Sequence, residues 1–292
     1  MELQQMRYAI AVAEERSFTR AAERCHVVQS ALSHQIKALE RELGTQLFAR
    51  TSRRVEVTSA GEAFVASARE SLAAAERAVA EAAATTGEVR GTLSVGVIPT
   101  VTAIDLPAVL GAFHRAHPHV HIHMRGGGSD QFIAAIAAGD LDVAVLGLHE
   151  AHVDRAGVAT RLLSSERLVA VLPAVHPLAQ RDALALRDLA GEVFVDFPDG
   201  TPGRVQSDCA FADAGLQRDV AFEAVSSDFM LELVDNGLVV ALLPQAVVEQ
   251  RPGLIALPVE DGPTRHEFLS WSSFNPSPAA RALMSSLDVV PT

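Results

Sequence analysis

The amino-acid sequence predicts an all-α N-terminal domain, a long linker helix and an α/β C-terminal domain built as two lobes. Three observations support this fold class. Residues 1–58 hold short runs with apolar residues three and four apart, residues 59–90 keep that spacing without a break, and residues 91–292 alternate β-rich runs with helical ones. At 292 residues the chain is long enough for two or three units that each bury a core.

Charge is distributed unevenly along the chain. The formal net charge is −12, which by itself argues against a polyanionic partner. However, residues 1–58 carry 9 Arg or Lys against 7 Asp or Glu, whereas residues 91–292 carry 12 against 24. A weakly basic N-terminal part followed by an acidic C-terminal part suits a protein that binds double-stranded DNA through residues 1–58 and not through residues 91–292.

Composition argues against several other classes of protein. The apolar runs are too short to span a bilayer, and the N-terminus lacks the cationic start and apolar block of an export signal. Cys25 and Cys209 lie far apart without CxxC spacing, which argues against a disulfide framework or a zinc knuckle. We therefore expect a cytoplasmic protein with reduced thiols, no membrane partner, no metal site and no cofactor.

Two helices are predicted at the start of the chain. Apolar residues from Leu3 to Ala13 repeat at helical spacing, and Ser17 is a suitable N-cap for a second helix with the sequence FTRAAERC. Only residues 26–28 separate this helix from a third one. The second and third helices must therefore cross steeply, as in a helix-turn-helix unit.

The third predicted helix, Gln29 to Gly44, has two different faces. Leu32, Ile36, Leu39 and Leu43 form one narrow apolar stripe at 100° per residue. The opposite face is polar and cationic, and it includes Gln29, Ser30, Ser33, His34 and Lys37. If the stripe packs on the first two helices, the polar face points outward and its N-terminal end can enter a major groove. A plain amphipathic helix in a three-helix core is the alternative.

The segment TQLFARTSRRVEVTSAG follows the third helix. It reads as two short extended pieces around a cationic tip that contains Arg50, Arg53 and Arg54. Such a hairpin is typical of a wing that reaches DNA phosphates.

The run SFTRAAERCHVVQSALSHQIKALERELGTQLFARTSRRVEVTSAGE resembles the N-terminal domain of LysR-type transcriptional regulators. The shared pattern is AA in the second helix, ALS.QI..LE in the third, LG..LF.R in the wing and T.AG at the start of the next helix. The resemblance implies that Gln29, Ser30, Ser33, His34 and Lys37 face bases or nearby phosphates. It also implies that Arg50, Arg53 and Arg54 hold the DNA backbone.

Two positions depart from the family pattern. His34 stands where arginine is common, and the shorter imidazole weakens bidentate readout of guanine. Val28 stands where a Ser or Thr cap is usual, which costs the third helix up to about 1 kcal/mol at its start.

Residues 59–90 predict a linker helix that dimerises. Thr58 or Ser59 forms a capping box with Glu62, and a thin apolar seam then repeats at three and four residues from Val65 to Ala82. Pairing with a second copy would hide this seam, although packing on its own domain is an alternative. In the family this segment is the dimerising helix, followed by a hinge, here around GEVRG, and the resemblance implies a homodimer or homotetramer.

The C-terminal part alternates strands and helices. TLSVGVI, VHIHM and LDVAVLGL are separated by the helices LPAVLGAFHRA and FIAAIAAG, and a second set follows with EVFVDF, VAFEAV and LVVALLP. This alternation indicates parallel βαβ units. It resembles the effector-binding domain of the same regulators, which shares its architecture with periplasmic solute-binding proteins. The resemblance implies a first lobe of about 91–162 and 267–292 and a second lobe of about 163–266.

Three loops are candidate ligand contacts, because open α/β sheets bind ligands beyond the carboxyl ends of their strands. They are Pro99 to Thr102, Gly126 to Gln131 and Phe197 to Gly203. Their hydroxyl residues can equally be ordinary helix caps. The resemblance places an effector at Thr100, Val101, Ser129, Phe197, Thr201 and Pro202. None of the three loops contains arginine, so a neutral or oxidant signal stays open beside an anionic metabolite.

Histidines and cysteines offer further candidates. On a strand, His119, His121 and His123 share one face while Val120, Ile122 and Met124 face the core. A solvent or subunit-contact face is favoured over a metal site, because no carboxylate or cysteine is aligned with these imidazoles. Peroxide-sensing members of the family use a pair of cysteines in the second lobe, whereas here Cys25 lies within residues 1–58. A single-thiol switch at Cys209 is the remaining redox alternative.

These observations together predict a sequence-specific DNA-binding transcriptional regulator controlled by a small-molecule effector between the two lobes. A redox- or metal-responsive regulator of the same architecture is one alternative. A cytoplasmic small-molecule-binding protein or an enzyme is another. No nucleophile elbow, phosphate loop or metal-ligand spacing occurs in the sequence, so we expect no catalytic residues.

Overall fold

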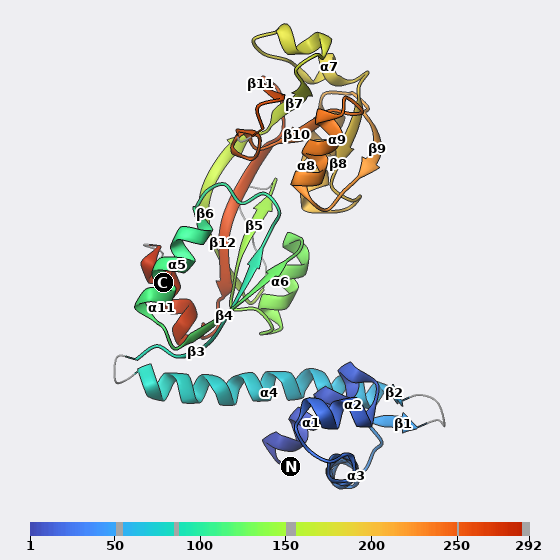
Figure 1. The fold of residues 1–292 in the computed structure, drawn as a ribbon, viewed down its shortest axis with the longest axis vertical. Helices are drawn as coiled ribbons and strands as arrows, with labels where there is room; N and C mark the ends of the chain where they lie inside the picture. Colours follow the sequence, from blue (N-terminus) through green and yellow to red (C-terminus); the bar gives the residue numbers. More distant parts are fainter. Residues whose placement is uncertain (51–54, 85–87, 150–155, 250, 288–292) are drawn as a thin grey trace. The chain divides into compact units, whose positions relative to one another are not determined.

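The computed structural model describes residues 1–50, 55–84, 88–149, 156–249 and 251–287 (Figure 1). The chain divides into two units, Met1–Gly87 and Glu88–Thr292, and each forms its own core. Within the described ranges, no helix is long and apolar enough to cross a membrane.

Three helices begin the first unit: α1 Leu3–Glu15, α2 Phe18–Arg24 and α3 Gln29–Leu43. The Ser17 hydroxyl accepts a hydrogen bond from the Arg20 N–H at 3.4 Å, which confirms the predicted cap of α2. α3 begins after Val28, which provides no side-chain cap. It ends at Gly44, whose φ of +69° is a left-handed conformation that favours glycine.

The core of the first unit forms where α1, α2 and α3 meet. Leu32, Ile36 and Leu39 are each 0% exposed, and they pack against apolar residues of α1, α2 and the hairpin that follows α3. The predicted stripe is therefore confirmed for these three residues. It is wrong for Leu43, which is 39% exposed, because α3 contributes to the core only as far as Leu39 and Leu43 lies at its end.

The predicted wing is an antiparallel hairpin of β1 Phe48–Arg50 and β2 Val55–Val57. The Glu40 carboxylate accepts hydrogen bonds from the backbone N–H groups of Leu47 and Phe48 at 2.9 and 3.2 Å, and so holds the start of the hairpin on α3. Arg53 and Arg54 lie outside the described residues.

The linker is one unbroken helix, α4 Ser59–Ala84. The Thr58 hydroxyl caps it by accepting a hydrogen bond from the Gly61 N–H at 3.0 Å. Its 26 residues give a length of about 39 Å. Val65 and Ala68 are buried, and the helix packs against α1, whereas Val79 is 66% exposed. Only the first part of the apolar seam is thus covered within this unit.

The second unit begins with a five-stranded sheet in the order β4-β3-β5-β12-β6. β3 pairs in parallel with β4 and β5, as predicted, and β12 pairs antiparallel with β5 and β6. Helices α5 and α11 contribute to the core on one face and α6 to the core on the other (Figure 1). The elements are β3 Gly91–Val97, α5 Leu106–Ala116, β4 Val120–Gly126, α6 Ser129–Ala137, β5 Val143–Leu148, β6 Val158–Arg167, β12 Thr264–Ser272 and α11 Pro278–Ser286.

The rest of the second unit surrounds two small sheets. β8 pairs in parallel with β9, but β7 pairs antiparallel with both β10 and β11. Phe194 of β8 also forms a parallel bridge with Val240, directly before β10, so the parallel pairing predicted for EVFVDF, VAFEAV and LVVALLP is confirmed. β7 is not part of that predicted set. The elements are β7 Val169–Pro173, a 3₁₀ turn Pro177–Gln180, α7 Leu186–Leu189, β8 Val193–Asp196, α8 Pro202–Asp213, β9 Asp219–Glu223, α9 Ser227–Asp235, β10 Ala241–Leu243, α10 Gln245–Val248 and β11 Leu254–Pro258.

Two long strands connect these parts. β6 and β12 pair along nearly their whole length, with Thr264 opposite Arg167 and Ser272 opposite Val158. The limits expected between the lobes, near residues 162 and 266, fall inside these two strands. β6 and β12 therefore carry the chain from one lobe to the other and back.

Candidate functional site

The polar face of α3 is the first candidate site. Gln29, Ser30, His34 and Lys37 are exposed and Ser33 is half-buried. Ser30, His34 and Lys37 lie on the side of the helix opposite the buried stripe of Leu32, Ile36 and Leu39. Ser33 lies at the flank of this side, and Gln29 is the first residue of the helix, next to the stripe.

The start of α3 is also open to a ligand. Val28, the residue before its first turn, is 68% exposed and provides no side-chain cap. The first N–H groups of a helix carry partial positive charge and suit a phosphate oxygen. Arg50 is the last residue of β1, the first strand of the wing. The arrangement can present short donors to base edges and cations to a backbone.

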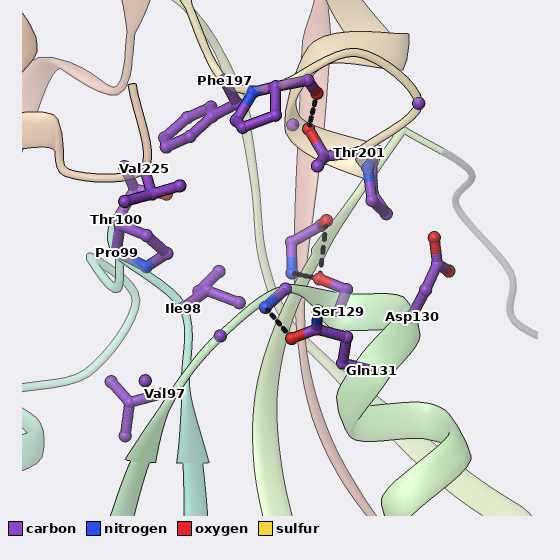
Figure 2. A pocket seen from close by; sticks show the side chains of 18 of the residues that line it. Val97, Ile98, Pro99, Thr100, Ser129, Asp130, Gln131, Phe197, Thr201 and Val225 are labelled. Atoms are coloured by element: carbon purple, nitrogen blue, oxygen red, sulfur yellow. Dashed lines mark hydrogen bonds between the residues drawn. The ribbon is translucent and has the colours of Figure 1, made fainter. Parts of the chain in front are cut away.

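The second candidate site is a cleft of about 730 Å³ in the C-terminal unit (Figure 2). Three loops that follow the carboxyl ends of β3, β4 and β8 line it, as parallel sheets favour. In Figure 2, Ser129 and Gln131 at the start of α6 lie on one side, and Phe197 and Thr201 lie on the other.

Five of the six residues predicted to contact an effector line this cleft: Thr100, Ser129, Phe197, Thr201 and Pro202. Val101 is not among the lining residues. Its side chain is partly buried and packs against the apolar cores of the five-stranded sheet instead. The chain thus directs the side chain that follows Thr100 inward, and the structure does not bring the Val101 side chain together with the other five predicted residues.

The predicted hydroxyl groups already have partners in the protein. Ser129 Oγ donates to the Gly147 carbonyl at 3.1 Å and accepts from the Gly147 N–H at 3.0 Å (Figure 2). Thr201 Oγ1 donates to the Pro198 carbonyl at 2.7 Å. Both hydroxyls shape the loops, and each keeps only acceptor capacity toward a ligand.

Arg265, a cleft residue that the loop sequences did not indicate, enters from β12. It is 3% exposed, and its Nη1 donates to the carbonyl and the hydroxyl of Thr100 at 2.8 and 2.5 Å. Its Nη2 contacts Glu267, which is 0% exposed, and Glu166 at 2.8 Å. Residues 265 and 267 share one face of the strand with Leu269 and Trp271, so charged residues at two inward positions were the available sequence signal.

A buried ion pair supports the loop on the other side of the cleft. Asp196 ends β8, directly before Phe197, and lies 2.7 Å from Arg218. The Asp196 carboxylate also accepts a hydrogen bond from the Phe197 N–H at 2.7 Å. Burial raises the pKa of Asp196 to about 6, against the opposing effect of the Arg218 guanidinium.

The histidines of β4 are not assembled into a metal centre. His121 and His123 are exposed on the edge strand of the sheet, and the described part of the chain contains no group of three or more His, Cys, Asp or Glu that could hold a metal ion. Val120 is buried and Ile122 half-buried, as expected. Met124 is 57% exposed, contrary to the prediction, because β4 has a neighbouring strand on one side only and its second half is uncovered.

The two cysteines lie in different units. Cys25 packs against the core of the first unit, and burial raises the pKa of its thiol. Cys209 is exposed on α8 and is not among the cleft residues.

Comparison with known proteins gives matches over both units. The family model described as "LysR substrate binding domain" matches residues 86–289, and the one described as "Bacterial regulatory helix-turn-helix protein, lysR family" matches residues 3–62. A hydrogen peroxide-inducible genes activator of Dickeya chrysanthemi is 36% identical over 262 residues, which cover 88% of this chain and 85% of that protein. The transcriptional dual regulator GltC of Bacillus subtilis (strain 168) is 33% identical and covers 89% and 87%.

A solved structure agrees with the fold as well. Full-length CbnR, in a crystal structure with its target DNA, has a TM-score of 0.74 and 26% identity, and the alignment covers 99% of both chains. Regulators of this family bind DNA, oligomerise and bind small-molecule effectors. The family matches, the helix-turn-helix with its outward polar face and the two-lobed α/β unit lead to one conclusion. The chain belongs to the LysR family of DNA-binding transcriptional regulators.

Proposed function

We propose that the chain binds an operator through the polar face of α3 and that a small molecule in the C-terminal cleft controls this binding. The observation that carries the proposal is the orientation of α3, since Leu32, Ile36 and Leu39 are buried whereas Gln29, Ser30, His34 and Lys37 are exposed. We further propose that the protein acts in the cytoplasm, where operator DNA is found, and that it catalyses no reaction.

Specific roles follow from side-chain chemistry. Ser33 and His34 contact base edges, since both are short donors or acceptors near the middle of the face. Gln29 and Ser30 lie at its N-terminal end, the part of a recognition helix that enters the groove. Lys37 is the single lysine of the chain and holds a phosphate, together with Arg50, Arg53 and Arg54 from the wing.

The test is a mobility shift of the full-length protein on the DNA that flanks its own gene. We expect a specific complex that survives excess competitor DNA of unrelated sequence. Affinity should fall steeply with salt, because several phosphates release counterions on binding. A shift that unrelated DNA removes as readily as flanking DNA would refute sequence-specific binding.

We propose that α4, within residues 59–90, is the dimerisation element. Beyond the turns packed on α1, its seam continues through Leu72, Ala75 and Val79, and Val79 is 66% exposed. An alanine-rich helix gains little stability on its own, whereas a paired seam removes apolar surface from water. One such pairing between two copies would give a dimer, and contacts of the C-terminal units would extend it to a tetramer.

Val79→Asp is expected to weaken this dimer, because it places a carboxylate opposite the seam of the partner. We predict a rise of about tenfold or more in the dimer dissociation constant, equal to about 1.4 kcal/mol, by analytical ultracentrifugation. Ala74→Asp is the matched control, since residue 74 is exposed on the opposite side of α4. Equal oligomeric states for the two variants would contradict the assignment of the seam.

A redox-responsive regulator is the second candidate, because the Dickeya relative is named as a hydrogen peroxide-inducible activator. The cysteines of this chain give it little support. Cys25 is partly buried against the core of the first unit and has a raised thiol pKa, and Cys209 is on the surface outside the cleft. A thiol with a raised pKa is a poor nucleophile toward peroxide.

Hydrogen peroxide is therefore expected to leave operator affinity unchanged in the wild type and in Cys209→Ser. Quantitative mobility shifts before and after treatment, with dithiothreitol reversal as the control, measure this. A peroxide-dependent change that is present in the wild type and absent in Cys209→Ser would replace the proposed mode of control with thiol sensing.

A further inference from the structure

The walls of the effector cleft are mainly apolar. Ile98, Pro99, Phe197, Pro198 and Val225 line it, together with glycines of the Gly126–Gly128 loop (Figure 2). Among the residues that the structure describes, three charged ones join them: Asp130, Asp199 and Arg265. The character of the ligand therefore depends on whether the Arg265 charge is available to it.

The charge of Arg265 is already neutralised by the protein. Nη2 contacts Glu267, and it lies 2.8 Å from the Glu166 carboxylate. Nη1 also donates to the carbonyl and the hydroxyl of Thr100, and Nη2 donates to the hydroxyl of Thr102. Nε is buried as well. A carboxylate ligand would have to compete with Glu267, which has no exposed surface and is fixed by hydrogen bonds from the Thr102 and Ala103 N–H groups at 2.9 and 3.2 Å.

The remaining charges that the structure describes near the cleft are negative or paired. Asp130 lies in the first turn of α6, where it offsets the partial positive charge of the helix N-terminus. Asp199 is exposed and accepts a hydrogen bond from the Gly200 N–H. Arg204, which follows the Phe197–Gly203 loop, is bound to Asp208 at 2.9 Å and to Glu223 at 3.4 Å. An anion in the cleft would thus meet an unfavourable potential.

The hydroxyl groups favour a ligand that donates hydrogen bonds. Ser129 and Thr201 already use their hydrogens on carbonyl oxygens of the protein and offer only lone pairs to the cleft. The carboxylates of Asp130 and Asp199 are acceptors as well. A carboxylate or phosphate group, which brings further acceptors, would find no donor among these four side chains.

From this arrangement we infer that the effector is an uncharged, mainly apolar small molecule whose polar groups donate hydrogen bonds. Arg265 is a positioning residue that holds Thr100 at the edge of the cleft and does not bind the effector. The inference rests on the proposed function, in that it takes the cleft as the effector site.

Matched aromatic probes test the inference: benzamide and benzyl alcohol against benzoate, each titrated into the full-length protein and followed by ligand-observed NMR. The blocked variant is Gly128→Leu, since a Cβ at Gly128 meets nothing within 4 Å and the side chain extends into the cleft. Gly191→Leu is the matched control, because a Cβ there is equally free and residue 191 is exposed outside the cleft.

We expect the two uncharged probes to bind the wild type and Gly191→Leu, and to lose binding in Gly128→Leu. Benzoate should bind about tenfold more weakly or not at all. Glu166→Gln, which removes one negative charge beside Arg265, should raise benzoate affinity severalfold and leave benzamide affinity unchanged.

Benzoate bound in the cleft as tightly as benzamide, or a benzoate deficit that Glu166→Gln does not reduce, overturns the inference. The inference is also overturned if Gly128→Leu binds all three probes as the wild type does. That result would in addition show that the cleft is not the effector site. Operator binding without any probe is measured on the same samples, so failure of the ligand class is distinguishable from failure of DNA recognition.

Discussion

Replacing Ser33 and Lys37 together by alanine is expected to weaken operator binding by about 2–4 kcal/mol, or roughly 30- to 1000-fold. Lys37 is exposed on the recognition face and supplies a full positive charge, and Ser33 lies one turn before it. Loss of the cation lowers the slope of the logarithm of the association constant against the logarithm of the salt concentration by about one. Loss of the hydroxyl reduces discrimination between operator and unrelated sequences. Mobility shifts at several salt concentrations separate the two effects.

The matched control for this variant is Arg7→Ala combined with Ser67→Ala. It also removes one hydroxyl and one positive charge, at exposed positions of α1 and α4. The free energy of unfolding should change by less than about 1 kcal/mol in both double variants, because three of the four positions are exposed and Ser33 is half-buried. Equal operator affinity in the test and control variants would show that the polar face of α3 does not meet DNA.

The helix-turn-helix part of the first unit was predictable, because the residues that determine it act locally. The spacing of Leu32, Ile36 and Leu39 fixes which side of α3 is buried, and Ser17 and Gly44 mark helix limits by their own backbone chemistry. The end of the stripe was not predictable in the same way. Whether Leu43 is covered depends on how far the neighbouring helices extend along α3, and periodicity carries no information on that.

The cleft was predictable in its loops but not in its charges. Thr100 and Ser129 follow β3 and β4, which are parallel neighbours in the five-stranded sheet, so their approach follows from topology. Thr201 follows β8 of a different sheet, so its approach to them does not follow from the order of strands in one sheet. The network around Arg265 joins three segments that are far apart in the sequence: the loop after β3, β6 and β12. Its existence depends on the register that sets His266 opposite Ser165, which a single sequence does not reveal.

The second large effect is expected at the buried pair beside the cleft. Arg218 has a side chain 3% exposed, which lies 2.7 Å from Asp196 and from Asp208 and over the rings of Phe194 and Phe211. Arg218→Met keeps much of the apolar contact but leaves the Asp196 carboxylate without its cation. We predict a loss of about 3–5 kcal/mol in the free energy of unfolding at pH 7.5, the usual cost of breaking a buried pair.

This loss should depend on pH in a defined direction. Burial already raises the pKa of Asp196 to about 6, and removal of Arg218 takes away the opposing effect, so the folded-state pKa rises further. An acid whose pKa is higher in the folded than in the unfolded state destabilises the fold above that pKa, and protonation relieves the cost as the pH falls through it. Urea unfolding should therefore show a smaller difference between Arg218→Met and wild type at pH 5 than at pH 7.5.

Arg251→Met is the matched control, because Arg251 pairs with Asp228 at 2.9 Å on the surface, where the two side chains are 36% and 79% exposed. Breaking that pair should cost at most about 1 kcal/mol, with little change between the two pH values. Since Asp196 directly precedes Phe197, Arg218→Met should also weaken benzamide binding in the cleft, whereas Arg251→Met should not. Equal losses of stability in the two variants would show that the Asp196 pair does not support the cleft loop.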